Sequence, residues 1–270
     1  MLQPRLEPPL AAPAAHSLRT RTGSVARGAP IENSLLAAVP RETYRRLRAG
    51  LEPVTLKFGE VLYEPGDAIR QVYFPGASLV SLLTLADGHL ALEVGLIGRE
   101  GMVGISLMLG HPVSPVRALV QASGPAMRMA AADFQREFRL SLPLRQELYR
   151  YTHALMAQIS QTAACNRFHV VEKRLARWLL MTHDRVQSDQ FRMTHEFLAH
   201  MLGVRRVGVT NAARALQARQ LIGYRRGDIT VLDRKGLEAA ACDCYAVVKG
   251  LHEGARAGTV LRKLRISAAA

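Results

Sequence analysis

The sequence predicts an α+β chain with an N-terminal β-roll, a long dimerisation helix and a C-terminal winged helix-turn-helix. Short alternating segments with frequent turns fill residues 53–131, and one long helical pattern follows from residue 142. A helix–glycine–helix pattern and a hairpin come next. The expected division is a disordered tail at 1–32, the roll at 33–141, the dimerisation helix at 142–168, the winged helix-turn-helix at 169–251 and a second tail at 252–270.

The charge of the 270-residue chain is +14, and it is unevenly distributed. Residues 167–270 hold 19 Lys and Arg against 9 Asp and Glu, a net charge of +10. A basic half indicates a polyanionic partner, either a nucleic acid or an acidic membrane surface. No apolar run is long enough to span a bilayer, and no secretory signal is present. We therefore expect a cytoplasmic protein with no membrane partner.

The chain has three cysteines, Cys165, Cys242 and Cys244. A sparse, odd set suits a reducing cytoplasm better than a disulfide framework. Cys242 and Cys244 are too close in sequence for a zinc CxxC pair, and the chain has no second cysteine pair. The sequence thus predicts neither a metal site nor a cofactor.

The first half of the chain reads as a tail, two short helices and a set of strands. Residues 1–30 are rich in Ala, Pro and Arg without periodicity. Asn33 is placed to cap one helix, and a second is expected from Arg41 to Leu51. Seven short segments rich in Val and Leu then predict strands, separated by Gly and Pro turns: 54–58, 60–64, 71–75, 78–85, 90–97, 117–123 and 125–130. Regular short strands indicate a sandwich or barrel-like roll.

Helical periodicity returns at 131–138 and continues in a long helix that has Pro143 in its first turn. Apolar and Thr side chains recur along that helix at 4-3-4-3 spacing, at Leu148, Thr152, Leu155, Ile159 and Thr162. This spacing predicts a coiled-coil seam for dimerisation. A helix packed on its own core would show a similar stripe. A further helix is expected over 170–183.

Residues 193–221 predict two short helices that meet at Gly203. Thr194 stands at the N-cap position, and Gly203 permits the left-handed conformation that ends a helix. The small Ala199 and the apolar Val209 complete the helix-turn-helix spacing, in which the second helix starts near Arg205. Strands at 222–224 and 229–232 form a wing, and one helix at 235–249 closes the domain. The alternative is an ordinary helical hairpin with a basic, solvated face.

Three segments resemble the Crp/Fnr family: EPGD at Glu64–Asp67, GREGMVG at Gly98–Gly104 and IGYRRGDITVLDRKGLE at 222–238. The resemblance covers about residues 33–251. It implies a cyclic-nucleotide-binding-type roll and a bacterial, homodimeric transcription factor. It also implies double-stranded DNA with a two-fold operator and RNA polymerase as partners.

Alignment with the family assigns base reading to Arg206, Val207 and Asn211. Arg206 suits guanine, Asn211 suits adenine or a phosphate, and Val207 offers only apolar contact, for example with a thymine methyl. The other expected DNA contacts are to phosphates, from Thr194, Arg205, Thr210, Arg214 and the wing residues Arg225 and Arg226. Each exposed arginine has a plain alternative as a solvated charge.

The residues that hold a cyclic nucleotide in the family are altered in this chain. Gly104 is kept, but Ile105 stands at the acidic position that would bind the ribose. Arg117 lies one or two residues beyond the expected phosphate-binding position, and Ser106 supplies only a hydroxyl. We expect an effector pocket at these four residues that has lost cyclic-nucleotide binding, with the effector unknown. The alternative is a cAMP- or cGMP-responsive regulator with a rearranged phosphate-binding segment.

A roll used as a scaffold or regulatory subunit is one alternative, and the winged helix-turn-helix argues against it. An enzyme is another alternative, and the motifs argue against that. The chain has no Ser–His–Asp signature, P-loop or Rossmann fingerprint. His195-Glu196 is followed by a second histidine at His200, one position too late for a zinc protease motif. We therefore expect a non-enzymatic protein.

Overall fold

The computed structural model describes residues 33–86, 90–186, 188–225 and 227–257, all within one compact unit, Glu32–Ala270. The tail expected at 1–32 lies outside the described residues, and so does the part of the tail expected at 252–270 from residue 258 onward. Helix α1 (Ser34–Ala38) begins at Asn33, whose side chain accepts a hydrogen bond from the Leu36 N–H at 3.0 Å. Helix α2 (Arg41–Arg48) ends before the expected Leu51, because Leu51 already pairs with Met129 in a strand.

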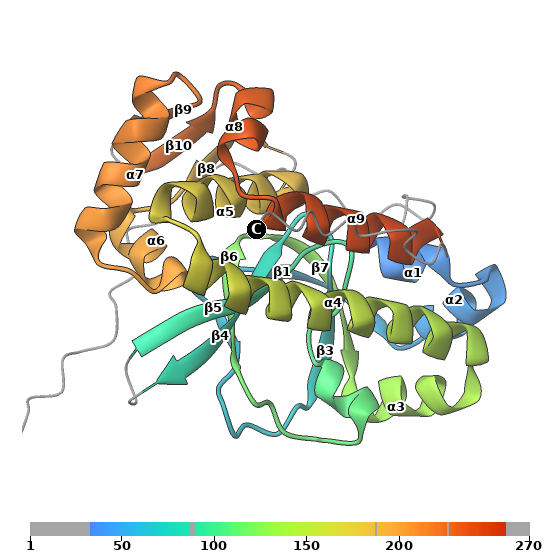
Figure 1. Ribbon diagram of the computed structural model, residues 1–270. Helices are drawn as coiled ribbons and strands as arrows, with labels where there is room; N and C mark the ends of the chain where they lie inside the picture. The colour runs from blue at the N-terminus through green and yellow to red at the C-terminus, as the bar shows by residue number, and fades with distance from the viewer. Residues whose placement is uncertain (1–32, 87–89, 187, 226, 258–270) are drawn as a thin grey trace, which may run out of the picture. The chain divides into compact units, whose positions relative to one another are not determined.

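Seven antiparallel strands build the roll from two sheets (Figure 1). The first sheet has the order β1-β7-β3 and the second β2-β6-β4-β5. Six of them lie within one residue of the predicted segments, whereas β1 begins three residues before the predicted segment 54–58. Their bounds are β1 (Leu51–Leu56), β2 (Val61–Tyr63), β3 (Gln71–Pro75), β4 (Leu79–Ala86), β5 (Leu90–Ile97), β6 (Arg117–Ala122) and β7 (Gly124–Ala130).

Between β5 and β6 lies a short 3-10 helix, η1 (Ile105–Leu109), which the sequence pattern did not predict. Gly104 and Gly110 bracket it with left-handed backbone, at φ values of 102° and 85°. A side chain would strain these conformations, so the two glycines set where η1 starts and stops. Leu107 and Met108 of η1 are buried.

Helices α3 (Ala131–Leu140) and α4 (Leu142–Phe168) follow the roll, and Ser141 caps α4. The stripe expected to be a coiled-coil seam is covered within the chain itself: Leu148, Thr152, Leu155 and Thr162 are buried and Ile159 is partly buried. Tyr151 on this side of α4 donates to the Met102 carbonyl at 3.0 Å, and Gln158 donates to the Leu96 carbonyl at 3.2 Å. The expectation of a dimer seam at this stripe is therefore wrong, because the stripe is covered by the roll and, at Thr162, by Arg177, which donates to its hydroxyl at 2.9 Å.

A second stripe on α4 is exposed. Its residues have the same 4-3-4-3 spacing, and each follows a residue of the buried stripe by one position. Its residues are Tyr149, His153, Met156, Ser160 and Ala163. Met156 is 63 % exposed and Tyr149 is 55 % exposed. Successive residues of a helix are about 100° apart around its axis. The second stripe therefore lies beside the buried one and is exposed to solvent.

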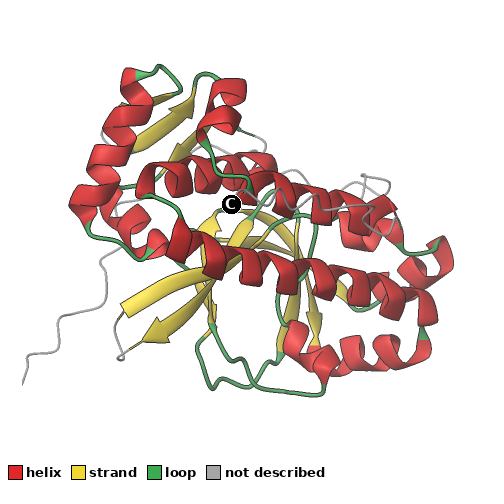
Figure 2. Cartoon of the chain, viewed as in Figure 1, coloured by secondary structure: helices red, strands yellow, loops and turns green. Residues whose placement is uncertain are grey.

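The C-terminal part combines helices with a third sheet of order β8-β10-β9, drawn apart from the roll in Figure 2. Its helices are α5 (Val171–Val186), α6 (His195–Leu202), α7 (Arg206–Ala218), α8 (Arg234–Ala240) and α9 (Cys244–Ala257), and its strands are β8 (Gln190–Arg192), β9 (Ile222–Arg225) and β10 (Asp228–Val231). Strand β8 was not predicted. It pairs with β10, and Ile229 lies opposite Phe191.

The single closing helix expected at 235–249 is two helices, α8 and α9. The chain breaks between them because Cys242 turns inward, where its Sγ lies 3.5 Å from the Sγ of Cys165. Helix α9 also continues six residues past the expected domain end at 251, through Ala257. His252 there contacts Gln158 of α4, with Nε2 3.2 Å from Oε1, so packing on α4 extends the helix. None of the described helices combines the length and the hydropathy needed to span a bilayer.

Candidate nucleic-acid interface

Helices α6 and α7 meet at the turn that the sequence predicts. The Thr194 hydroxyl accepts a hydrogen bond from the Phe197 N–H at 3.1 Å and so caps α6. Gly203 ends α6 with left-handed backbone at φ 59° and ψ 44°. The Val204 N–H then reaches back to the Ala199 carbonyl at 3.0 Å, which closes the turn. Local chemistry alone therefore produces the two-helix unit.

The inner faces of both helices are packed into the core of the C-terminal part. Val209 and Leu216 of α7 are fully buried, as is Leu198 of α6. They belong to the same apolar cluster as Leu175 and Leu179 of α5. This packing holds α7 rigidly and leaves its other face to solvent.

The outer face of α7 presents most of the residues predicted to contact DNA. Their spacing places them on successive turns of α7, from its N-cap to just past its midpoint. Exposed there are Arg205, Arg206, Val207, Asn211 and Arg214. Val207 is 61 % exposed although it is apolar. Among the described residues, most of this side chain is left uncovered on a basic surface.

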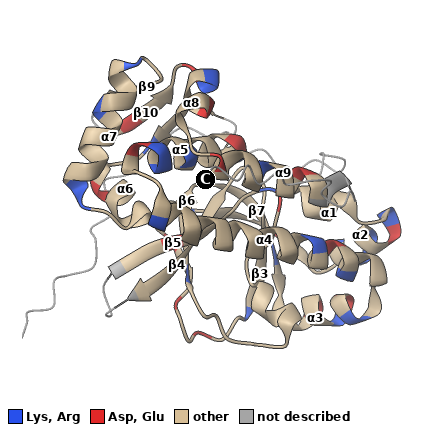
Figure 3. Cartoon of the chain, viewed as in Figure 1, with Lys and Arg blue, Asp and Glu red and all other residues tan. Residues whose placement is uncertain are grey.

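The N-terminus of α7 is electrostatically suited to an anion. Its first turn contains no acidic residue, and Arg205 at the N-cap makes no side-chain capping bond. Helix N-termini carry partial positive charge and free N–H groups, which bind phosphate. Two arginines at this end add to the positive potential (Figure 3).

Ion pairs divide the arginines of this region into two groups. Arg219, at the far end of α7, pairs with Glu172 at 3.1 Å. Within the part of the chain that the structure describes, Arg205, Arg206 and Arg214 form no ion pair with a carboxylate. Their charges are therefore free to meet an external polyanion.

Thr210 and His195 are held inside the domain. The Thr210 hydroxyl donates to the Arg206 carbonyl at 3.1 Å and lies 3.0 Å from His195 Nδ1. The His195 ring stacks on Tyr224 with centroids 4.2 Å apart. Burial lowers the pKa of His195, and the charges of Arg206 and Arg214 lower it further, which favours a neutral ring. His195 joins α6, α7 and the wing, a role that no sequence motif indicated.

The wing places Arg225 at the exposed end of β9. Arg226, its predicted partner in phosphate binding, lies outside the described residues. Gly227 adopts φ 90°, and its carbonyl accepts a hydrogen bond from the Met193 N–H at 2.6 Å. The wing is thereby fastened to the residue just before α6, next to the Thr194 cap.

The four residues expected at the effector pocket lie in two elements of the roll. Gly104 is the N-cap of η1, and Ile105 and Ser106 form its first turn, where both are partly buried. Arg117 instead begins β6, and its Nε lies 2.8 Å from a carboxylate oxygen of Glu64. A nearby cavity of the roll is lined by Tyr63, Asp67, Arg70 and their neighbours, none of which was expected there.

A cluster that the sequence pattern missed joins α4 to the start of α9. It consists of Cys165, His169, Cys242 and Cys244, whose metal-binding atoms all lie within 4.8 Å of one another. The sequence pattern did not single out Cys165 and His169, which are four residues apart at the C-terminal end of α4. That spacing was the available signal.

Comparison with known protein families finds a match for the C-terminal part of the chain. Residues 173–240 match the family of Crp-like helix-turn-helix domains. No curated protein matches the chain. Solved structures share its fold. FixK2 from Bradyrhizobium japonicum has a TM-score of 0.61 and 13 % identity, with 71 % of this chain and 98 % of that chain covered.

Two further structures have the same fold. A Crp/Fnr-family transcriptional regulator from Eubacterium rectale gives a TM-score of 0.61 at 17 % identity, with 78 % of this chain and 99 % of that chain covered. The c-di-GMP-responsive global regulator CLP of Xanthomonas campestris gives 0.55 at 19 % identity, with 71 % and 99 % covered. The fold is therefore that of Crp/Fnr regulators.

Proposed function

We propose that this chain, of Crp/Fnr type by its helix-turn-helix domain and its fold, is a sequence-specific DNA-binding transcriptional regulator. The carrying observation is the outer face of α7. It presents Arg205, Arg206 and Arg214 to solvent with no ion pair among the described residues, and its helix N-terminus favours phosphate. A second helix held against a buried core is the element that enters a major groove.

Base reading falls to Arg206, Val207 and Asn211. Arg206 can donate two hydrogen bonds to guanine, Asn211 can pair with adenine, and Val207 can contact a thymine methyl. Arg205, Arg214 and Arg225 serve as phosphate contacts, which give affinity rather than sequence preference. Thr194 and Thr210 have weaker support as phosphate contacts, because their hydroxyls already serve the cap of α6 and the Arg206 carbonyl.

The regulator acts as a homodimer on a two-fold operator. The support is the exposed stripe on α4 from Tyr149 to Ala163, whose 4-3-4-3 spacing suits a two-helix seam. The Met156 and Tyr149 side chains are large and apolar yet more than half exposed. A second copy of α4 would cover them and would place two α7 helices on adjacent half-sites.

The roll has lost cyclic-nucleotide binding in this proposal. A buried cyclic phosphate needs a cationic partner, and Arg117 is already paired with Glu64. Ile105 cannot bind a ribose hydroxyl. The alternative, a cAMP- or cGMP-responsive regulator, requires Arg117 to leave Glu64 for the ligand. RNA polymerase is a further proposed partner, and the protein works in the cytoplasm without enzymatic activity.

Selection of bound sequences from random double-stranded DNA tests the main proposal. We expect purified protein to enrich one motif with two-fold symmetry. Gel shifts over a salt series should then show that the preference for this motif persists at physiological salt while total affinity falls. A protein that only attracts polyanions would enrich no motif and would lose all preference as salt rises.

A further inference from the structure

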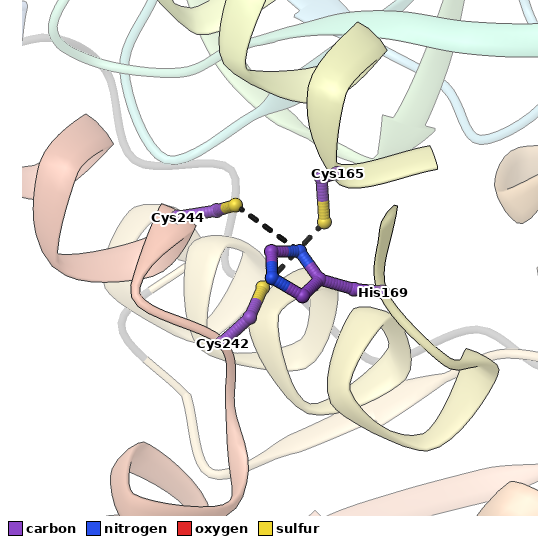
Figure 4. Close-up of side chains that lie close together, drawn as sticks. All are labelled: Cys165, His169, Cys242 and Cys244. Carbon is purple, nitrogen blue, oxygen red and sulfur yellow. Dashed lines mark hydrogen bonds between the residues drawn. The ribbon is translucent and has the colours of Figure 1, made fainter. Parts of the chain in front are cut away.

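We propose that Cys165, His169, Cys242 and Cys244 bind one structural zinc ion, which fastens the C-terminal end of α4 to the start of α9. The four side chains converge on a common point (Figure 4). Two come from the last turn of α4 and its C-cap, and two from the break between α8 and α9. The proposal does not depend on DNA binding.

The local structure positions each pair of ligands. Cys165 and His169 are four residues apart, so they lie on the same side of the end of α4. The His169 N–H donates to the Cys165 carbonyl at 3.1 Å and keeps the two residues in register. Cys242 precedes α9 and Cys244 begins it, with the exposed Asp243 between them. The break in the helix therefore turns both thiols inward.

The distances fit one ion with four ligands. The Sγ atoms of Cys165 and Cys242 are 3.5 Å apart, and Cys244 Sγ is 3.5 Å from His169 Nδ1. Zinc–sulfur bonds of about 2.3 Å in a tetrahedron place two sulfurs roughly 3.8 Å apart. In an iron–sulfur cluster the ligands are divided among two or more irons, so the full ligand set spans a longer distance. Ligand atoms that all fall within 4.8 Å match a single ion.

Burial and outer contacts resemble those of a closed structural site. Cys165 is 0 % exposed, Cys242 is 6 % exposed and Cys244 is 2 % exposed. Gln161, one turn before Cys165, donates its amide N–H to Cys244 Sγ at 3.0 Å. Such a bond to a metal-bound thiolate orients the ligand and stabilises its charge.

The surrounding charge also fits the ion. Three thiolates and a neutral imidazole on a divalent cation leave one net negative charge. Arg174 and Arg177 are buried beside the cluster, and both interact electrostatically with Cys165. Within the described part of the chain, the Nε atoms of both arginines have no hydrogen-bond partner. Buried cations need a compensating anion, and a zinc–tristhiolate centre supplies one.

Thiolate and imidazole ligands in a tetrahedral, closed set select zinc. The ion would join segments 77 residues apart, Cys165 and Cys242. It would hold α9 on α4 next to His169, where α4 ends and the chain continues into α5. Its effect is to fix how the C-terminal part sits on the long helix.

The test is metal analysis and cobalt substitution of the full chain. We expect the protein purified under reducing conditions to contain one zinc per chain. After removal of the metal by a chelator, Co²⁺ should give thiolate-to-cobalt charge-transfer absorption and the visible bands of a tetrahedral site. Cys242→Ser and His169→Asn should reduce bound metal at least tenfold, and His111→Asn, a change at an exposed histidine of the roll, should leave it unchanged.

Circular dichroism of each variant separates lost ligands from lost folding. A folded His169→Asn variant with full metal content would overturn the proposal. So would folded, reduced wild-type protein that binds no Co²⁺.

Discussion

The indole Nε1 of Trp178 donates a hydrogen bond of 2.9 Å to the carboxylate of Glu93, and this contact joins α5 to strand β5 of the roll. The Ser81 hydroxyl donates to the other carboxylate oxygen at 2.7 Å. Both Trp178 and Glu93 are buried. The contact lies beside an apolar cluster that Leu79 and Leu83 of the roll share with the helix-turn-helix. A change in the roll therefore has a direct physical route to the DNA-binding helices.

Glu93 should make folding stability depend on pH. Burial raises the pKa of Glu93 from 4.5 to about 7. The hydrogen bonds from Ser81 and Trp178 lower the pKa, but they offset only part of this effect. Between these two pKa values the folded chain keeps a proton that the unfolded chain releases. The contribution of Glu93 to the free energy of unfolding is therefore full below about pH 4.5 and is lost as pH rises through 7. Glu93→Gln should raise the free energy of unfolding relative to wild type by roughly 2–3 kcal/mol at pH 8 and little at pH 4.5.

Urea unfolding at both pH values measures this difference. Glu60→Gln, a change at an exposed carboxylate, serves as the control and should shift neither value. A Glu93→Gln variant that is less stable than wild type at pH 8 would show that the charged carboxylate stabilises the fold.

Arg206→Ala should weaken binding to the selected operator by about 1–3 kcal/mol and have little effect on random DNA. The reason is that Arg206 is proposed to read a base. The matched control is Arg219→Ala on the same helix, because Arg219 already pairs with Glu172. Gel shifts on both DNAs measure the effects. Equal losses on operator and random DNA would leave Arg206 as a phosphate contact only.

Met156→Glu should weaken the dimer at least tenfold, or about 1.4 kcal/mol, because it places two like charges in the proposed seam. Sedimentation equilibrium measures the dissociation constant. Val113→Glu makes the same kind of change at an exposed apolar residue of the roll and should have no effect. If Met156→Glu stays as dimeric as wild type, the exposed stripe of α4 is not the interface.

Cyclic nucleotides should not stabilise the protein. A ligand present at 100 times its Kd would add about 2.7 kcal/mol to the free energy of unfolding, which thermal melting detects readily. We expect no change in melting temperature with cAMP or cGMP. A clear rise that Arg117→Ala abolishes would instead support the rearranged phosphate-binding segment.

The sequence alone determined the features that local chemistry controls. The Thr194 cap, the left-handed Gly203 and the spacing from Ala199 to Val209 specified the helix-turn-helix, because each acts within a few residues. Alternation located all seven strands of the roll for the same reason. The position of strand β8 depended on pairing with β10 and was missed.

Tertiary structure decided everything that depends on which surfaces meet. A 4-3-4-3 spacing on α4 shows that a stripe exists, but only packing showed that Leu148 faces the roll while Tyr149 faces solvent. Arg117 meets Glu64 across 53 residues, and Cys165 meets Cys242 across 77. Periodicity and spacing report neighbours along the chain. The contacts that pair Arg117, cover one side of α4 and gather four metal ligands form only when distant segments fold against one another.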